Sequence, residues 1–179
     1  HKDERQRRLA VRRLFELDDP ESLVGFIPLL SDEDPWFRQK GMEAVRRWLG
    51  NGQGKVVEML AESPHPEQRV LASNLALRGD GGRTEMLLEL CEDPETSVRL
   101  AAWKARLGID NSEAAIVIAL ALKSEEVEVR RIALQRLSLM EEVDLDLMRT
   151  VLSDPSPKVV STAISLVEKR PELSEDSEI

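Results

Sequence analysis

Apolar and polar positions along the chain follow a pattern that returns about every 31 residues. Each period contains two apolar segments with helical spacing, separated by a short turn rich in Asp, Ser and Pro. Residues of these types cap helices or begin them. The first segment of each period ends in a leucine, at Leu30, Leu60, Leu90, Leu122 and Leu152. The pattern therefore predicts a repeating unit of helix A, tight turn and helix B.

Two columns of aligned residues mark helix B. Arginine occupies the first column in five units, at Arg7, Arg38, Arg69, Arg99 and Arg130, and Val160 takes the sixth place. A small residue follows three positions later, at Ala10, Gly41, Ala72, Ala102, Ala133 and Ala163. Such small side chains allow neighbouring helices to approach closely. We expect B helices at residues 2–17, 35–49, 66–78, 95–107, 125–139 and 156–170, followed by an acidic C-terminal tail at residues 171–179.

The segments "DEDPWFRQKGMEAVRRWLG", "DPETSVRLAAWKARLG" and "SEEVEVRRIALQRL" resemble HEAT repeats, and the resemblance covers residues 2–170. It implies an all-α fold, a right-handed superhelix or solenoid of about five and a half helix pairs, in a single domain over residues 1–170. Two features depart from the family pattern. The first unit has no helix A, and the sixth unit carries Val160 in place of arginine.

The resemblance also implies a structural role for the repeated arginines. In HEAT-like folds this arginine reaches the acidic or carbonyl-rich turn of its own repeat or of the adjacent one. The structural column comprises Arg38, Arg69, Arg99 and Arg130, and the expected acceptors are Asp32, Asp93 and Asp154. The aliphatic stem packs while the planar guanidinium makes several hydrogen bonds. These arginines are therefore weak evidence for a ligand site.

One helix A is predicted to be apolar on both faces. The segment "AAIVIALAL", Ala114 to Leu122, fits a strand or a buried helix, and only its place in the repeat favours a helix. Alignment on Leu122 puts Ala115, Ile118, Ala119 and Leu122 on the inward face. The same alignment puts Ile116, Val117 and Leu120 on the outward face, where they form a possible second apolar contact surface.

Charge is distributed unevenly between the two helix classes. The predicted B helices hold 21 of the 25 Lys and Arg residues but only 10 of the 34 Asp and Glu residues, a balance of +11 against −20 elsewhere. In HEAT-like solenoids the B helices line the concave surface. The resemblance thus implies a groove that is richer in cations than the acidic shell around it.

The candidate partner-binding residues lie on the predicted concave face. A column five residues after the repeated arginine is polar in every unit, at Arg12, Glu43, Asn74, Lys104, Gln135 and Ser165. The candidate set is Arg8, Arg12, Glu43, Arg46, Arg47, Asn74, Arg78, Lys104, Arg131 and Gln135. Two interpretations remain open, a solvated helix face and a binding groove.

The sequence offers little for catalysis. Its two histidines are His1, at the terminus, and His65, in a Pro-rich turn, and neither suits a catalytic triad. Zinc-binding CxxC and HExxH spacings are absent. We therefore expect a non-enzymatic protein without cofactor or metal. No apolar run reaches the length of a membrane span, so we expect a soluble, cytoplasmic protein that does not bind membranes.

Two functions fit these features. The first is a scaffold that binds a protein or peptide partner through the concave B-helix surface. The alternative is binding of duplex DNA by the basic residues of that surface, as in some HEAT-like proteins. The net charge of −9 counts against nucleic acid. The oligomeric state is left open.

Overall fold

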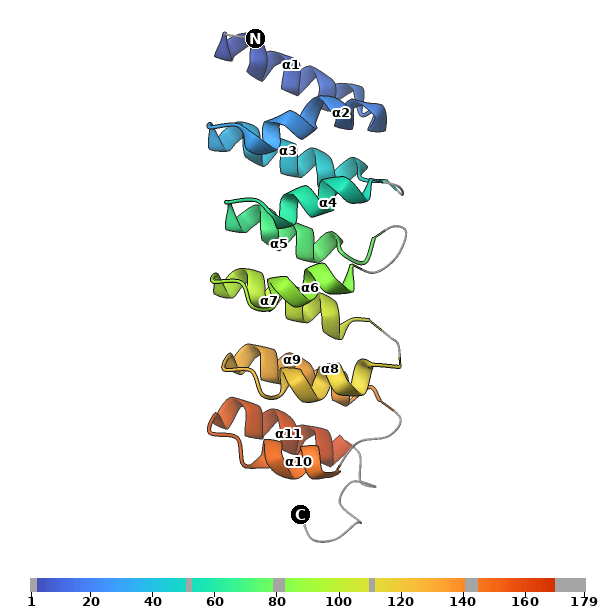
Figure 1. The fold of residues 1–179 in the computed structure, drawn as a ribbon, viewed down its shortest axis with the longest axis vertical. Helices are drawn as coiled ribbons and strands as arrows, with labels where there is room; N and C mark the ends of the chain where they lie inside the picture. Colours follow the sequence, from blue (N-terminus) through green and yellow to red (C-terminus); the bar gives the residue numbers. More distant parts are fainter. Residues whose placement is uncertain (1–2, 51–52, 79–82, 110–111, 141–144, 170–179) are drawn as a thin grey trace. The chain divides into compact units, whose positions relative to one another are not determined.

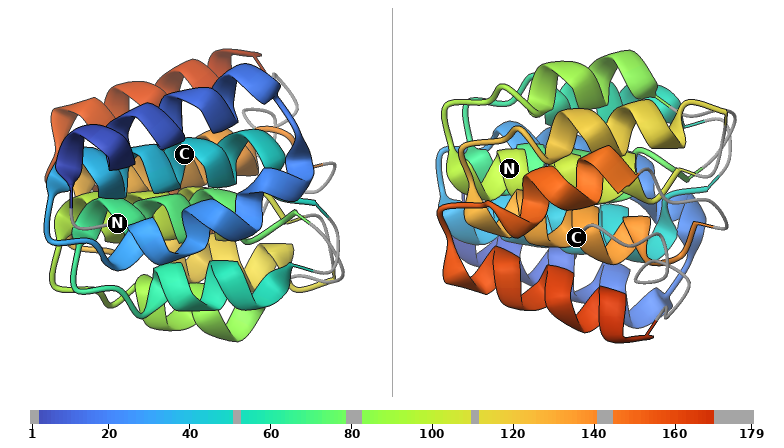
Figure 2. Two further views of the ribbon diagram at one scale, coloured as in Figure 1. Left: turned by 90° about the horizontal axis from the view of Figure 1, so that it is seen from above. Right: turned by 90° about the horizontal axis from the view of Figure 1, so that it is seen from below.

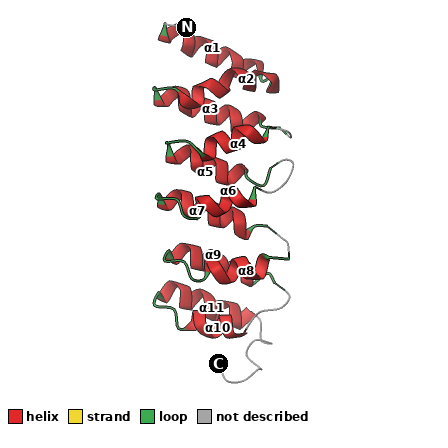
Figure 3. Cartoon of the chain, in the orientation of Figure 1, coloured by secondary structure: helices red, strands yellow, loops and turns green. Residues whose placement is uncertain are grey.

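The computed structural model describes residues 3–50, 53–78, 83–109, 112–140 and 145–169. Within these ranges the chain forms helices and connecting loops and contains no strand (Figure 3). The predicted all-α class is therefore confirmed for the described residues. The chain divides into two compact units, residues 1–86 and 87–179, and the boundary falls within α6. The predicted tail at 171–179 lies outside the described residues.

The first unit begins with the longer helices. Its elements are α1 (Glu4–Leu17), η1 (Pro20–Ser22), α2 (Leu23–Phe26), η2 (Ile27–Ser31), α3 (Pro35–Trp48), α4 (Gly54–Ala61), α5 (Pro66–Leu75) and the start of α6 (Thr84–Leu90). They follow one another in chain order (Figure 1). Viewed from above, α1, α3 and α5 lie to one side of this unit, and α2 and α4 lie to the other (Figure 2).

The second unit repeats this alternation. It contains the end of α6, then α7 (Thr96–Leu107), α8 (Ala114–Ala121), α9 (Val127–Leu137), α10 (Leu145–Leu152) and α11 (Pro157–Lys169). Within it α7 packs on α9, and α9 packs on α11. We call α1, α3, α5, α7, α9 and α11 the B helices. Each of them lies inside the range that the sequence predicts for it.

The turn before each B helix is closed by one recurring hydrogen bond. A side-chain oxygen of Asp or Ser accepts from the backbone N–H two residues later, which is the geometry of an Asx or Ser turn. The acceptors are Asp32, Ser63, Asp93, Ser124 and Asp154, at donor–acceptor distances of 3.0, 3.1, 2.9, 3.2 and 2.8 Å. Proline then occupies the first turn of α3, α5 and α11, where its missing N–H leaves no helical bond unmade.

The small-residue column lies in the core of both units. Gly41, Ala72, Ala102, Ala133 and Ala163 are all buried. A Cβ atom at Gly41 would lie 2.9 Å from Cδ2 of Leu30 and 3.2 Å from its backbone nitrogen. The first member, Ala10 of α1, is exposed. At Gly41 the small residue lets α3 lie directly against Leu30 of η2.

Tryptophan contributes to the core of each unit. In the first unit Trp48 packs with Phe15 and Phe26 at centroid distances of 5.2 and 5.5 Å, and its indole N–H donates to Asp18 at 3.0 Å. In the second unit Trp103 is buried, with 8% of its surface exposed. Both rings add aromatic surface to a core that is otherwise mainly aliphatic.

The predicted orientation of α8 is wrong by one residue. The buried positions are Ala114, Val117, Ile118 and Ala121, whereas Ala115 is exposed and Leu122 is half-buried. Val117, which was expected on the outward face, is thus part of the core. The position that lies nine residues before the repeated arginine is buried in neighbouring repeats, at Leu60 and Leu90, and in α8 this position is Ala121. The alignment followed the leucine one residue later.

Candidate functional site

The repeated arginines bind the turns that precede their own helices. In each case Nη1 donates to the carbonyl oxygen six residues earlier: Arg38 to Asp32, Arg69 to Ser63, Arg99 to Asp93 and Arg130 to Ser124, at 2.9, 2.9, 2.7 and 2.8 Å. Arg38, Arg99 and Arg130 also donate to the next carbonyl, at 2.9 to 3.0 Å. The guanidinium thus satisfies carbonyl oxygens of the turn, which lie outside the hydrogen-bonding pattern of the helix.

Arg7, Arg99 and Arg130 each also reach the turn of the next repeat. Arg7 pairs with Asp32, and Arg99 donates from Nε to Glu126 at 2.6 Å. Arg130 binds Asp154 with two hydrogen bonds, from Nε at 2.7 Å and from Nη2 at 2.9 Å. This fork geometry is specific to arginine, because a lysine ammonium offers no pair of parallel donors.

The acceptor of Arg99 is not the residue that the alignment suggests. Ser124 stands where three other turns have aspartate, and Glu126, two residues later, supplies the carboxylate. Ser124 itself donates its hydroxyl to Glu126 at 2.9 Å. In the sequence, the only indication of this acceptor is that the turn contains a further acidic residue, Glu126.

The carboxylates that Arg130 and Arg99 bind in the following turn both have lowered pKa values. Hydrogen bonds from Arg130 hold the pKa of Asp154 below its usual 3.8, and this effect exceeds the opposing effect of burial. Burial raises the pKa of Glu126, but the hydrogen bonds from Arg99 and Ser124 outweigh it and the net shift is downward. Both groups are therefore ionised in the folded protein at neutral pH, and the arginines that face them are neutralised.

The polar column lies on the solvent side of the B helices. Arg12, Asn74, Lys104, Gln135 and Ser165 are exposed, and Glu43 is half-buried. Within the first unit the column runs along α1, α3 and α5, and within the second unit it runs along α7, α9 and α11. The repeat thus places one polar, water-facing position on every B helix.

Ion pairs within the protein engage four of the ten candidate binding residues. Arg8 binds Glu4 and Asp34 at 2.8 and 3.0 Å, and it also covers the ring of Trp36. The other pairs are Lys40 with Glu43 at 2.6 Å, Arg47 with Asp18 at 2.7 Å and Arg131 with Glu128 at 2.7 Å.

The remaining six candidates form no ion pair within the described ranges. They are Arg12, Arg46, Asn74, Arg78, Lys104 and Gln135, and all are exposed. Four of them are cations, and no carboxylate of the described residues forms an ion pair with them. These are the groups that remain available to a partner.

The possible second contact surface is smaller than the sequence suggests. Ile116 and Leu120 of α8 are exposed, at 62% and 46%, whereas Val117 retains only 7% of its surface. Two residues of the predicted patch therefore face solvent and the third supports the core.

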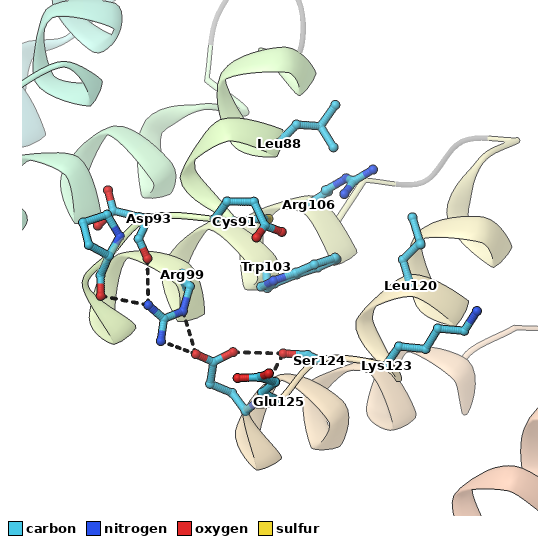
Figure 4. Close-up of a pocket in the computed structure, with 13 residues that line it drawn as sticks. Leu88, Cys91, Asp93, Arg99, Trp103, Arg106, Leu120, Lys123, Ser124 and Glu125 are labelled. Carbon is cyan, nitrogen blue, oxygen red and sulfur yellow. Dashed lines mark hydrogen bonds and ion pairs between the residues drawn. The ribbon is translucent and has the colours of Figure 1, made fainter.

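A pocket of about 740 Å³ lies in the second unit, where α6, α7 and α8 meet. Figure 4 shows Leu88 and Arg106 on one side and Leu120 and Lys123 on the other, with Trp103 between them. Arg106 is 9% exposed, and its guanidinium carbon lies 5.4 Å from the centroid of the Trp103 ring. Cys91, also in the wall, is 3% exposed, and burial raises its pKa to about 11. Sequence reasoning did not find this pocket.

The described part of the chain contains no group of His, Cys, Asp and Glu residues arranged to hold a metal ion. None of its helices combines the length and the apolar character needed to cross a bilayer. No protein-family model matches the chain, and no curated protein matches it either.

Proposed function

We propose that this chain is a cytoplasmic, non-enzymatic, HEAT-like solenoid that binds a protein or peptide partner through the concave surface of its B helices. One observation carries the proposal. The polar column faces solvent on the B helices, while the arginines of the other column are used inside the fold. A column of mainly exposed polar side chains that recurs at a fixed spacing presents a regular surface to a partner.

The charges of this surface favour a partner of acidic or mixed character. Arg12, Arg46 and Lys104 are exposed cations that form no ion pair with any described residue. Glu43 and the amides of Asn74 and Gln135 add hydrogen-bonding groups at equivalent positions. Charges at an interface contribute mainly to specificity and to the rate of association.

The proposal is tested by charge reversal on the polar face. Partners are isolated by affinity purification and identified by mass spectrometry, and their binding to the purified chain is then measured by calorimetry. The triple variant R12E/R46E/K104E should weaken binding strongly, because three unpaired cations become anions. All three side chains are exposed, so the variant should keep the helical circular dichroism of the wild type.

A matched control reverses three cations elsewhere, in K55E/R149E/K158E. These side chains are also exposed, and the change in net charge is the same. The control should bind as the wild type does. Equal binding by the wild type and both triple variants would exclude the polar face as the binding surface.

Binding of duplex DNA is the second candidate, because the predicted B helices hold 21 of the 25 cations. The net charge of −9 and the acidic Glu43 within the polar column argue against it. DNA binding would weaken steeply as salt is raised. Fluorescence anisotropy with a labelled duplex at low and at moderate salt separates the two functions, since the absence of any binding at low salt excludes DNA.

A further inference from the structure

The pocket between α6, α7 and α8 contains a buried cation without a carboxylate partner. Arg106 forms no ion pair within the described residues, and its Nε–H group is buried without a hydrogen-bond acceptor. The neighbouring Cys91 thiol remains protonated at neutral pH and supplies no negative charge. Arg106 as a residue is only 9% exposed, so its charge is poorly hydrated and an anion that binds it gains more than it would at the surface.

The other walls of the pocket are apolar and aromatic. Trp103 is buried between Leu88 of α6 and Leu120 of α8, and both leucines are more than one-third exposed, at 42% and 46%. The two leucines lie on separate helices beside the Trp103 ring (Figure 4). An apolar group in the pocket can therefore contact a leucine on each side and the tryptophan ring between them. Lys123 adds a second cation at the rim.

The acidic residues of the pocket do not cancel this attraction. Glu126 is already bound to Arg99, and the buried carboxylate of Asp93 accepts the backbone N–H of Glu95. Glu92 and Glu125 are exposed, so water and salt screen them. The buried guanidinium of Arg106 therefore makes the interior of the pocket more favourable for an anion than for a cation.

We propose that this pocket binds a carboxylate carried on an apolar group, with the carboxylate at Arg106 and the apolar group against Trp103, Leu88 and Leu120. The carboxylate can belong to a free organic acid or to an acidic side chain of a peptide, because both present the same chemistry. This site lies apart from the polar column. Its occupancy does not depend on the proposed scaffold function.

The test compares an acid with its uncharged amide. Fluorine NMR follows the binding of para-fluorophenylacetate and of para-fluorophenylacetamide to the whole chain. A charged hydrogen bond predicts that the acid binds about tenfold more tightly than the amide. Equal binding of the two probes, or no binding of either, would overturn the proposal.

Three variants locate the site. R106Q should abolish the preference for the acid, with circular dichroism to confirm that it folds. L120S, at an exposed position, should weaken both probes and keep their ratio. The control K158Q removes one positive charge from an exposed position of α11 outside the pocket and should change neither affinity. Retention of the acid preference in folded R106Q, or unchanged affinity in L120S, would contradict the assignment.

A competition experiment distinguishes the two sources of the carboxylate. The peptide acetyl-Leu-Glu-Phe-amide, with its Gln counterpart as control, is added to the complex with para-fluorophenylacetate. Displacement by the Glu peptide alone supports an acidic side chain of a partner as the occupant. Binding of the free acid without displacement by either peptide supports a small organic acid.

Discussion

Arg130 in the second unit and Arg38 in the first occupy the same position of the repeat, yet only Arg130 reaches a carboxylate. Both donate to two carbonyl oxygens of the turn before their own helix. Arg130 also donates two hydrogen bonds to Asp154 in the following turn, and the side chains of Arg130 and Asp154 are only 10% and 9% exposed. The following turn for Arg38 offers Ser63, and the Nε of Arg38 is buried without an acceptor.

The region around Arg38 is joined to its neighbour by a different bond. Gln68 of α5 is buried, and its side-chain amide donates to the carbonyl of Leu30 at 2.7 Å. The comparison separates two functions of the arginine column. Ordering its own turn is common to the column, whereas bridging to the next repeat requires an acid in the following turn. Such a bridge is replaced by an amide where that acid is missing.

The largest effect is expected at the bidentate pair. Arg130→Met leaves the carboxylate of Asp154 buried without its cation, and the loss of one partner of a buried pair costs about 3–5 kcal/mol. Urea unfolding followed by circular dichroism measures the change. The matched substitution Arg38→Met leaves no carboxylate unpaired and should cost about 1–2 kcal/mol. Equal costs at the two positions would remove the distinction between them.

The same pair should make stability depend on acid pH. The pKa of Asp154 is lowered in the folded state by Arg130, so the unfolded state binds a proton more readily. The stabilisation is complete above the ordinary pKa of 3.8 and is lost as pH falls through the lower, folded-state value. The free energy of unfolding of the wild type should therefore approach that of Asp154→Asn below pH 3.8. A difference between the two proteins that is constant across this range would contradict the assignment.

The amide bridge in the first unit should be weaker than the ion pair. Gln68→Met keeps the length of the side chain but leaves the carbonyl of Leu30 without its donor, which costs about 1–3 kcal/mol. Unfolding in urea gives the value directly. Gln135→Met changes an exposed glutamine on α9 and is the control, which should alter stability by less than about 0.5 kcal/mol.

The smallest expected effect is an increase in stability. Ser63→Asp supplies Arg38 with the carboxylate that Asp32 gives Arg7, and it keeps an oxygen for the N–H of His65. We expect stabilisation by about 1 kcal/mol in thermal unfolding. The gain should vanish in the Arg38→Met background. A gain of the same size in both backgrounds would show that the carboxylate acts through another group.

The sequence predicted the B helices and the turns because both depend on contacts between residues close in the chain. The column arginines bond to carbonyls six residues earlier, so their spacing alone carries the information. The orientation of α8 failed for the opposite reason. Its residues are apolar on every side, so no polar position indicates which face is buried, and packing against α7 and α9 sets it.

The sequence predicts where the candidate site residues lie on the helices, but it does not predict which of them form ion pairs within the protein. The sequence places Arg12 and Arg47 alike on a predicted B helix, yet only Arg47 meets a carboxylate, since Asp18 at the end of α1 lies close in space and far in the chain. The sequence did not predict the pocket over Trp103 either. It depends on how far apart α6 and α8 lie, and no pattern within one helix encodes that separation.

A double-mutant cycle between Arg130 and Asp154 tests most directly whether the arginine column binds one repeat to the next. Urea unfolding of the wild type, Arg130→Met, Asp154→Asn and the double variant gives the coupling free energy. The two bonds between these side chains predict a coupling of about 1–3 kcal/mol. Additive effects, with a coupling below about 0.5 kcal/mol, would show that the arginine does not join the repeats.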